Sequence, residues 1–383
     1  MTARSLNILV YEFDIFPYRD IIAALKEQGH NVDIFNLPFT SHVNDVVFES
    51  SLKKKLSDAS FDCVFSVNYI TVVAKACHEH KIPYVSWCCD TPLLSMYHPS
   101  ISYPENHIYM FDKMETMRFN KRGIDTVHHL PLAATPKFGH LEHVEYLYDI
   151  SFVGNLYDKN RYDEMTHFLP DYLVGYMDAA IEAQQNIQGG NILVSMLTDE
   201  IISALEPYIR LEKDDESQTE IKLHFATSVL SYKVAALNRI NALNLLGRSF
   251  KNLHLFTTSD TSCITGTSVH PAVNYHSEAP KVFAASKINL NFTAPNIESG
   301  IPLRVFDILS SGGFVLTDFR EELFEFFEPD KDLVVFENNE DLVLKTQYYL
   351  AHEKERMIIA SNGYHTLCKH HTYKQRLEKI LAF

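Results

Sequence analysis

A charged pair three residues apart, Arg304 and Asp307, lies in a segment that has the pattern strand, loop, helix, Gly-Gly turn and strand (residues 291–318). Pro302 suits the first turn of that helix, because its missing N–H costs nothing there. Gly300 lets the backbone approach a ligand closely. Since the free N–H groups at a helix start favour an anion, we predict that this segment binds a diphosphate.

The two charged residues share one face of the helix. Arg304 can add a charge-assisted contact to phosphate, and Asp307 can accept hydrogen bonds from ribose hydroxyls. The same spacing is also that of an ordinary solvated ion pair on a helix surface. The residue pattern by itself leaves both interpretations open.

Composition and missing motifs exclude several function classes. The formal net charge of −15 argues against a general nucleic-acid binder, which must neutralise many phosphates. The chain has neither the glycine fingerprint of dinucleotide-binding dehydrogenases after its first strand nor a P-loop. No signal-peptide pattern, no apolar run of membrane-spanning length and only six Cys occur, so we expect a cytoplasmic protein without a membrane span.

The histidines and cysteines do not predict a metal site. The 19 His include adjacent pairs, such as His128-His129, which cannot easily converge on one ion. Cys88-Cys89 lacks the two-residue gap of a thiolate site. We therefore expect no metal and no bound cofactor.

The positions of strands and helices predict an α/β protein of two domains with a cleft between them. Residues 1–145 alternate strands (7–13, 31–35, 61–67, 84–87) with helices, as in a doubly wound parallel sheet. Residues 146–383 begin a second such domain, interrupted by a helical insertion at about 162–245. A final helix near residues 373–381 is a candidate to pack back on the first domain.

Residues 300–318 resemble the donor-site block of the CgeB-like (spore-maturation) glycosyltransferases, a group with the GT-B fold of two Rossmann-like domains facing across a cleft. The resemblance extends over nearly the whole chain except the helical insertion. It includes residues 61–67, 84–92, 151–157 with Arg161, 281–292, 325–336 and 371–373.

The resemblance implies a metal-independent glycosyltransferase that moves a sugar from a nucleotide-diphosphate sugar to an acceptor hydroxyl. The second domain would hold the donor, with Arg304 and the Gly300 loop at the diphosphate, Asp307 at the ribose and Arg161 as a second phosphate ligand. The implied donor-binding set also contains Gly154, Asn155, Glu298, Ser299, Gly312 and Gly313.

The chain departs from related enzymes at two points. Asp307 stands where they commonly carry Glu, and its side chain is one methylene shorter. Glu298 and Asp307 are separated by eight residues, whereas many retaining GT-B enzymes have two Glu separated by seven, so we do not infer retention. The acceptor, the sugar and the stereochemical outcome stay open.

An inverting transfer needs a base that takes the proton of the acceptor hydroxyl. Asp90, which follows the strand at residues 84–87, is the leading candidate, and Asp14, after the first strand, is the second. Two other functions share the fold: a catalytically silent nucleotide-sugar or glycan-binding scaffold, and a nucleotide-sugar 2-epimerase.

Overall fold

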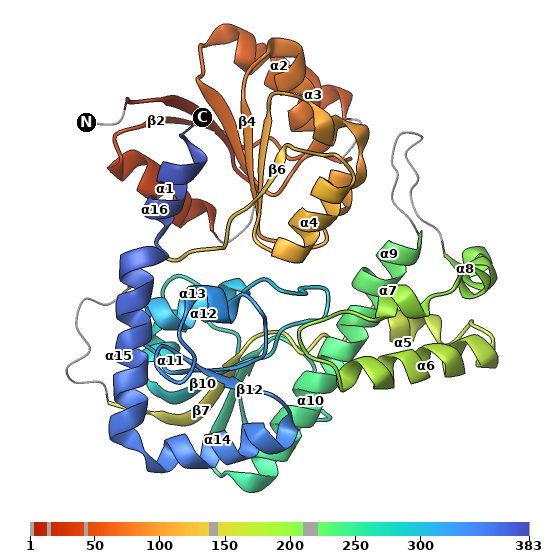
Figure 1. Cartoon of the computed structure of the whole chain (residues 1–383), viewed down its shortest axis with the longest axis vertical. Helices are drawn as coiled ribbons and strands as arrows, with labels where there is room; N and C mark the ends of the chain where they lie inside the picture. Colours follow the sequence, from red (N-terminus) through yellow and green to blue (C-terminus); the bar gives the residue numbers. More distant parts are fainter. Residues whose placement is uncertain (1–3, 14–16, 42–44, 138–144, 210–220, 383) are drawn as a thin grey trace. The chain divides into compact units, whose positions relative to one another are not determined.

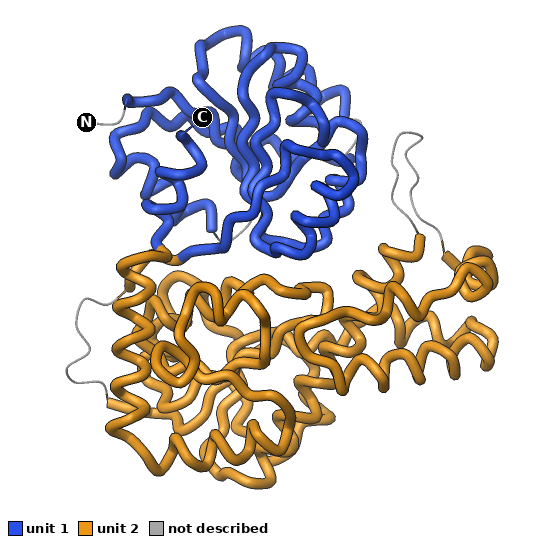
Figure 2. Tube along the Cα trace, viewed as in Figure 1, with its two compact units in different colours: residues 1–133, 212–219, 372–383 blue, residues 134–211, 220–371 orange. Residues whose placement is uncertain are grey.

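The computed structural model describes residues 4–13, 17–41, 45–137, 145–209 and 221–382. These residues form two compact units, shown in different colours in Figure 2. Unit 1 contains the described residues up to Ala133 and those from Thr372 onward, and unit 2 contains the rest. These units are defined by contacts within the fold. The predicted domain boundary between residues 145 and 146 stays a prediction.

Unit 1 is built on a sheet of six parallel strands in the order β2-β1-β3-β4-β5-β6. Its central strands are runs of apolar residues buried on both faces, as parallel sheets covered by helices require. The strands are β1 (Asn7–Tyr11), β2 (Asn31–Phe35), β3 (Cys63–Val67), β4 (Tyr84–Cys88), β5 (Asn106–Met110) and β6 (Val127–His129). The helices are α1 (Tyr18–Glu27), α2 (Val46–Asp58), α3 (Thr71–His80), α4 (Lys113–Lys121) and α16 (Tyr373–Ile380).

The last helix of the chain, α16, belongs to unit 1. It begins at a capping box made by Thr372 and Gln375. Gln28, at the end of α1, donates to the Lys374 carbonyl at 3.0 Å, and the buried Arg376 donates to the Pro131 carbonyl at 2.9 Å. These hydrogen bonds and the contact between α1 and α16 attach the end of the chain to the unit that holds its beginning.

Unit 2 also has a sheet of six parallel strands, in the order β12-β11-β10-β7-β8-β9. Counted within the unit, this is the Rossmann order 3-2-1-4-5-6. The strands are β7 (Tyr148–Val153), β8 (Leu253–Thr257), β9 (Ser268–Pro271), β10 (Ser286–Asn291), β11 (Val315–Asp318) and β12 (Val334–Phe336). The helices that follow the strands are α11 (Ala279–Ala284), α12 (Leu303–Ser310), α13 (Leu323–Phe326), α14 (Asn339–Ala351) and α15 (Glu353–His370).

The expected helical insertion is a set of helices that joins β7 to β8. In Figure 1, α6 to α9 project from the sheet, while α10 runs back along it. These helices have their own small core, which includes Leu173, Met177 and Leu230. The helices are α5 (Arg161–Met165), α6 (Asp171–Gln185), α7 (Leu193–Met196), α8 (Asp199–Leu205), α9 (Ile221–Phe225) and α10 (Ser231–Ser249).

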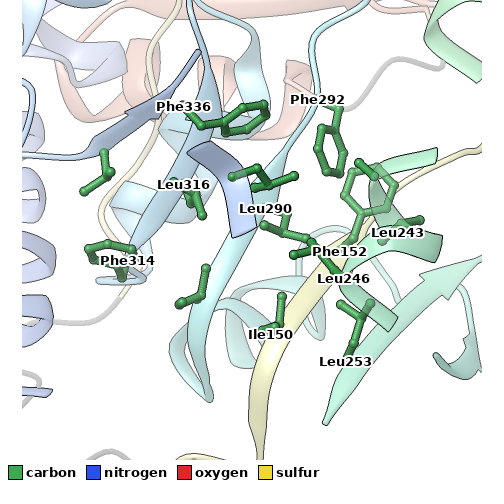
Figure 3. Close-up of a cluster of buried hydrophobic side chains, with 14 of the residues drawn as sticks. Ile150, Phe152, Leu243, Leu246, Leu253, Leu290, Phe292, Phe314, Leu316 and Phe336 are labelled. Atoms are coloured by element: carbon green, nitrogen blue, oxygen red, sulfur yellow. The ribbon is translucent and has the colours of Figure 1, made fainter. Parts of the chain in front are cut away.

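The two faces of the unit 2 sheet differ in chemistry. Alternation along β10 sends Ile288 and Leu290 into the large apolar cluster that contains residues of α10 and α14 (Figure 3). Asn289 points to the opposite face, where its side-chain amide donates to the Phe283 carbonyl of α11 at 3.0 Å. We call these the α10/α14 face and the α11/α12 face. Both faces border the same end of the sheet, where the carboxyl ends of the strands lie. We call this end the carboxyl edge.

Candidate functional site

The carboxyl ends of β7 and β10 form the switch point of the unit 2 sheet. The two strands are neighbours, but the connections after them lead toward opposite sides of the sheet. Open α/β sheets bind ligands in the crevice that this divergence creates outside the strand ends. Gly154 follows β7 here, and Thr293 follows β10.

Arg239 of α10 joins the two loops at this point. Its guanidinium donates to the Asn155 carbonyl at 2.5 Å and to the Phe292 carbonyl at 2.8 Å. The guanidinium also stacks over the Tyr157 ring, 4.4 Å from its centroid. Sequence reasoning missed this residue, because a residue 84 positions from its partner gives no local signal.

Three of the predicted donor-binding residues lie in the segment that follows β7. The N–H of Gly154 continues the sheet by donating to the Phe256 carbonyl at 3.1 Å. Asn155 is exposed, and its side-chain oxygen accepts from Ser259 at 3.3 Å and from the Tyr157 N–H. Arg161 is exposed at the first position of α5, which Asn160 caps. Gly154 and Asn155 therefore lie at the switch point, and Arg161 opens the next helix.

Helix α12 begins directly after the loop that leaves β10, with Pro302 as its N-cap residue. Arg304 lies in its first turn and donates to Asp307 at 3.2 Å, with side chains 28% and 13% exposed. The other carboxylate oxygen of Asp307 accepts from the Tyr275 hydroxyl at 2.6 Å. The two residues form the ion pair that their spacing allows, and the ion pair lies at the anion-favouring end of the helix.

Tyr275 is a further residue that sequence reasoning missed. It lies in the loop between β9 and α11 and supplies an aromatic ring beside the hydrogen-bonded carboxylate.

The loop before α12 is held in place by a buried carboxylate. Ser299 donates to Glu322 at 2.8 Å, and the backbone N–H of Glu322 returns a bond to the Ser299 carbonyl at 3.2 Å. Ser299 and Glu322 are both buried, as is Gly300, while Glu298 is half-buried. Ser299 thus shapes the loop, and Gly300 lies where that loop leads into α12.

Gly312 and Gly313 lie at the other end of α12. Gly312 has a φ of 71°, the left-handed conformation common just after a helix. A Cβ on Gly313 would lie 2.7 Å from the Asn289 side-chain nitrogen and 2.9 Å from the Phe283 carbonyl oxygen. The structure therefore does not bring these two glycines to the strand ends with Gly300 and Arg304. Gly312 instead suits the left-handed backbone after the helix, and Gly313 suits close packing.

Asp90 in unit 1 lies two residues after the end of β4. It is exposed, and its carboxylate accepts from the side-chain amide of Asn68 at 2.7 Å. The Asn68 oxygen accepts from the backbone N–H of Cys89 at 2.9 Å and of Asp90 at 3.3 Å. Asn68 follows β3 in the left-handed conformation, with a φ of 62°, which Asn tolerates better than most residues. Asp14, the second candidate base, lies outside the described residues.

The Cys89 thiol, next to Asp90 in the sequence, and the Tyr18 phenol at the end of β3 are held in their neutral forms. Burial raises the pKa of the Cys89 thiol well above its usual value, and it also raises the pKa of the Tyr18 phenol. The Tyr18 hydroxyl accepts from the Val67 N–H at 2.8 Å. Cys89 is consequently a poor nucleophile at neutral pH.

The described residues contain neither a metal-binding cluster nor a membrane-spanning helix. No group of three or more His, Cys, Asp or Glu in this part of the chain is arranged to hold a metal ion. None of the helices that the structure describes is both long enough and apolar enough to cross a membrane.

The C-terminal part of the chain is similar to one family of known proteins. Residues 233–382 match the family described as glycosyl transferase-like. This range runs from α10 through α16 and includes the whole of α12. No curated protein matches the chain in sequence.

Solved structures share the fold over nearly the whole length. A glycosyltransferase from Rickettsia africae is 10% identical with a TM-score of 0.54, over 99% of this chain and 97% of that one. HepE from Anabaena, in complex with UDP and glucose, is 9% identical with a TM-score of 0.56, over 98% and 99%. Sucrose-phosphate synthase from Thermosynechococcus elongatus is 9% identical with a TM-score of 0.52, over 98% and 97%. These likenesses confirm the predicted GT-B fold.

Proposed function

Since the chain has the GT-B fold and its residues 233–382 match a glycosyl transferase-like family, we propose that it moves a sugar from a nucleotide-diphosphate sugar to an acceptor hydroxyl without a bound metal. One observation carries the proposal. Arg304 lies at the free N-terminus of α12, on the carboxyl edge of the unit 2 sheet. This is the arrangement that an open α/β sheet offers to a diphosphate.

The roles of the donor-site residues follow from their contacts. The N–H groups at the start of α12 and the Arg304 guanidinium would hold the diphosphate, and the turn at Gly154 and Asn155 would approach it from β7. Asp307 would accept from ribose hydroxyls while it keeps Tyr275 in place. Support comes from HepE, which shares the fold and was solved in complex with UDP and glucose.

The reaction breaks the bond between the anomeric carbon and the diphosphate oxygen and forms a bond from that carbon to the acceptor oxygen. Negative charge grows on the leaving diphosphate as the bond breaks. Arg304 and the α12 dipole stabilise that charge, which is the largest catalytic contribution in many enzymes. In an inverting reaction, Asp90 takes the acceptor proton, oriented by Asn68.

The proposal also places the chain with the CgeB-like glycosyltransferases, on the strength of residues 300–318. Asp307 would then carry out with a shorter side chain what Glu does in related enzymes. The hydrogen bond from Tyr275 at 2.6 Å fixes the carboxylate orientation, which compensates for the missing methylene by reducing its freedom.

Calorimetric titration of the whole chain with UDP, GDP, ADP and dTDP, each in EDTA, tests the donor site and the metal-free mechanism together. We expect at least one nucleotide to bind in EDTA, and to raise the unfolding temperature because it binds only the folded state. Binding that appears only after magnesium or manganese is added would contradict the metal-free mechanism.

Product analysis with the nucleotide sugar that binds best separates the three functions that this fold can carry. A transferase consumes the donor only when an acceptor is present. An epimerase converts the donor alone, and a silent scaffold binds it without releasing the nucleotide. Either of the last two results would overturn the proposed transfer.

A further inference from the structure

A cavity lies at the carboxyl ends of the strands of the unit 2 sheet. Its volume is about 410 Å³, within the range of small-molecule sites. It is bounded by the loops that follow β10, β11 and β12, by the start of α14, and by α10 and the loop after α6. All of these segments belong to unit 2.

This cavity is distinct from the α12 site because it is lined by residues of the α10/α14 face and by none of α12. Asn238 and Ala242 of α10 line it, as do Phe292 and Phe336, which belong to the apolar cluster of that face. Arg304 and Asp307 belong to α12, on the other face. The loop between β10 and α12 connects the two sites: its first residues line the cavity, and its last residues lead into α12.

Side-chain amides dominate the polar lining of the cavity. The carboxamide of Asn238 has no hydrogen-bond partner among the residues that the structure describes. Gln188 accepts from the Phe319 N–H at 3.0 Å, which leaves its amide donors available. Asn186 donates to the Glu182 carbonyl at 2.9 Å, which leaves its side-chain oxygen available. Such amides pair as donor and acceptor with neighbouring hydroxyl groups.

The charges of the cavity disfavour an anion. Its cation, Arg320, is 3% exposed and is already paired with Asp318 at 3.2 Å, and it donates to the Thr293 carbonyl at 3.2 Å. Two exposed carboxylates, Glu337 and Glu340, line the cavity where β12 leads into α14. A phosphorylated ligand would therefore meet two carboxylates and an arginine that is already neutralised.

Two aromatic rings complete the lining. Phe292 and Phe336 meet edge to face, with ring centroids 5.9 Å apart, and Figure 3 shows both at one end of the apolar cluster. Both also border the cavity, but they are only 6% and 3% exposed, so most of each ring is buried in the apolar cluster. The cavity therefore offers a ligand mainly amide donors and acceptors, which match a neutral ligand rich in hydroxyl groups.

We propose that this cavity binds a neutral saccharide, at a site distinct from the nucleotide-sugar site. The side-chain amides take the hydroxyl groups, and the carboxylates keep phosphorylated sugars out. The helical region therefore has a binding role, since α10 and the loop after α6 supply part of the lining. This site goes beyond the proposed transfer and does not depend on it.

Ligand-observed NMR with the whole chain tests the site, using methyl α-glucoside, N-acetylglucosamine, maltose, cellobiose and glucose 6-phosphate. We expect at least one neutral sugar to bind, and glucose 6-phosphate to bind more weakly than methyl α-glucoside. Asn238→Leu removes the amide at nearly constant volume and should weaken neutral-sugar binding about tenfold. Gln188→Ala should do the same if Asn238→Leu fails to fold.

Asn241→Leu is the matched control, because Asn241 is an exposed residue of the same helix and does not line the cavity. It should bind the sugars as the unaltered chain does. UDP titration of each variant separates the two sites: Asn238→Leu should leave UDP affinity unchanged. Absence of binding by every neutral sugar, or sugar binding that Arg304→Ala abolishes and Asn238→Leu does not, would overturn the inference.

Discussion

The carboxyl edges of the two sheets carry opposite chemistry. In unit 2, two arginines lie at this edge: Arg239 joins the loops after β7 and β10, and Arg304 opens α12, whereas the buried Arg320 is already paired with Asp318. In unit 1, the loops after β3 and β4 present the amide of Asn68 and the carboxylate of Asp90. The proposed transfer would use the first edge to bind an anion and the second to accept a proton.

The difference shows that strand order positions a site, while a few side chains decide its chemistry. Both sheets have a switch point, between β1 and β3 in unit 1 and between β7 and β10 in unit 2. A donor with a diphosphate requires positive charge, and an acceptor hydroxyl requires a base. The two edges therefore suit the two halves of one transfer reaction, and each can be disabled separately.

The largest expected effect is that of Asp90→Asn. The amide keeps the size of the side chain but removes the basic oxygen, so sugar transfer should fall a hundredfold or more, within the typical range for general-base catalysis. Nucleotide affinity should stay unchanged, because the diphosphate site belongs to unit 2. Transfer is measured with the donor that binds best, and NMR of the product gives its anomeric configuration.

Asp58→Asn is the control for this substitution, since Asp58 is an exposed residue at the end of α2 and should have no effect. If the Asp90→Asn protein transfers sugar normally, Asp90 has only a structural role in its turn. Asp14 then becomes the candidate base. Retention of the anomeric configuration would remove the need for a base of this kind.

The next effect in size is that of Arg304→Ala. Removing one donor to a developing charge costs about 3 kcal/mol, roughly a hundredfold in rate, and nucleotide affinity should fall as well. Turnover and UDP affinity are measured together, with Arg248→Ala as the control, because Arg248 is exposed near the end of α10. Full turnover in a folded Arg304→Ala protein would show that the pair with Asp307 is only a surface salt bridge.

Most strands and helices could be predicted from the sequence. The bounds predicted for β2, residues 31–35, agree with the structure, because apolar residues and turn signals delimit them. Several elements were not predicted: β5, α4 and β6 in unit 1, and β9, α11, α13 and α15 in unit 2. Two of them show why. Strand β9 is short, mostly exposed and polar, and in α15 the buried Ile359, Ala360 and Leu367 are spread over a long polar helix. Neither has the apolar periodicity on which the prediction depends.

The candidate site could be predicted only where it is local in sequence. Gly300, Arg304 and Asp307 fall within one helix start, so their proximity follows from helix geometry. Arg239 and Tyr275 reach the same edge from other elements, and only the fold brings them there. The sequence at Gly312 and Gly313 does not distinguish a ligand contact from a structural requirement. The structure shows a left-handed backbone at Gly312 and a tight packing contact at Gly313.

The smallest expected effect on activity is that of Gly313→Ala. This substitution tests whether the two ends of α12 have different roles. In Gly313→Ala, the new methyl group would lie within 3 Å of the Asn289 amide, of Ile308 and of the Phe283 carbonyl. Asn289 would have to move from its hydrogen bonds to the carbonyls of Phe283, at 3.0 Å, and Phe314, at 3.2 Å. Overpacking of this kind costs about 1–3 kcal/mol of unfolding free energy, so denaturant unfolding should shift to lower concentration.

UDP affinity per folded molecule should stay the same in Gly313→Ala, because Arg304 and the start of α12 lie at the other end of the helix. Gly175→Ala is the matched control: nothing lies within 4 Å of a Cβ there, and alanine in mid-helix should leave the protein as stable or slightly more so. A Gly313→Ala protein that keeps its stability but binds UDP tenfold more weakly would return Gly313 to the diphosphate site, and the two ends of α12 would then share one function.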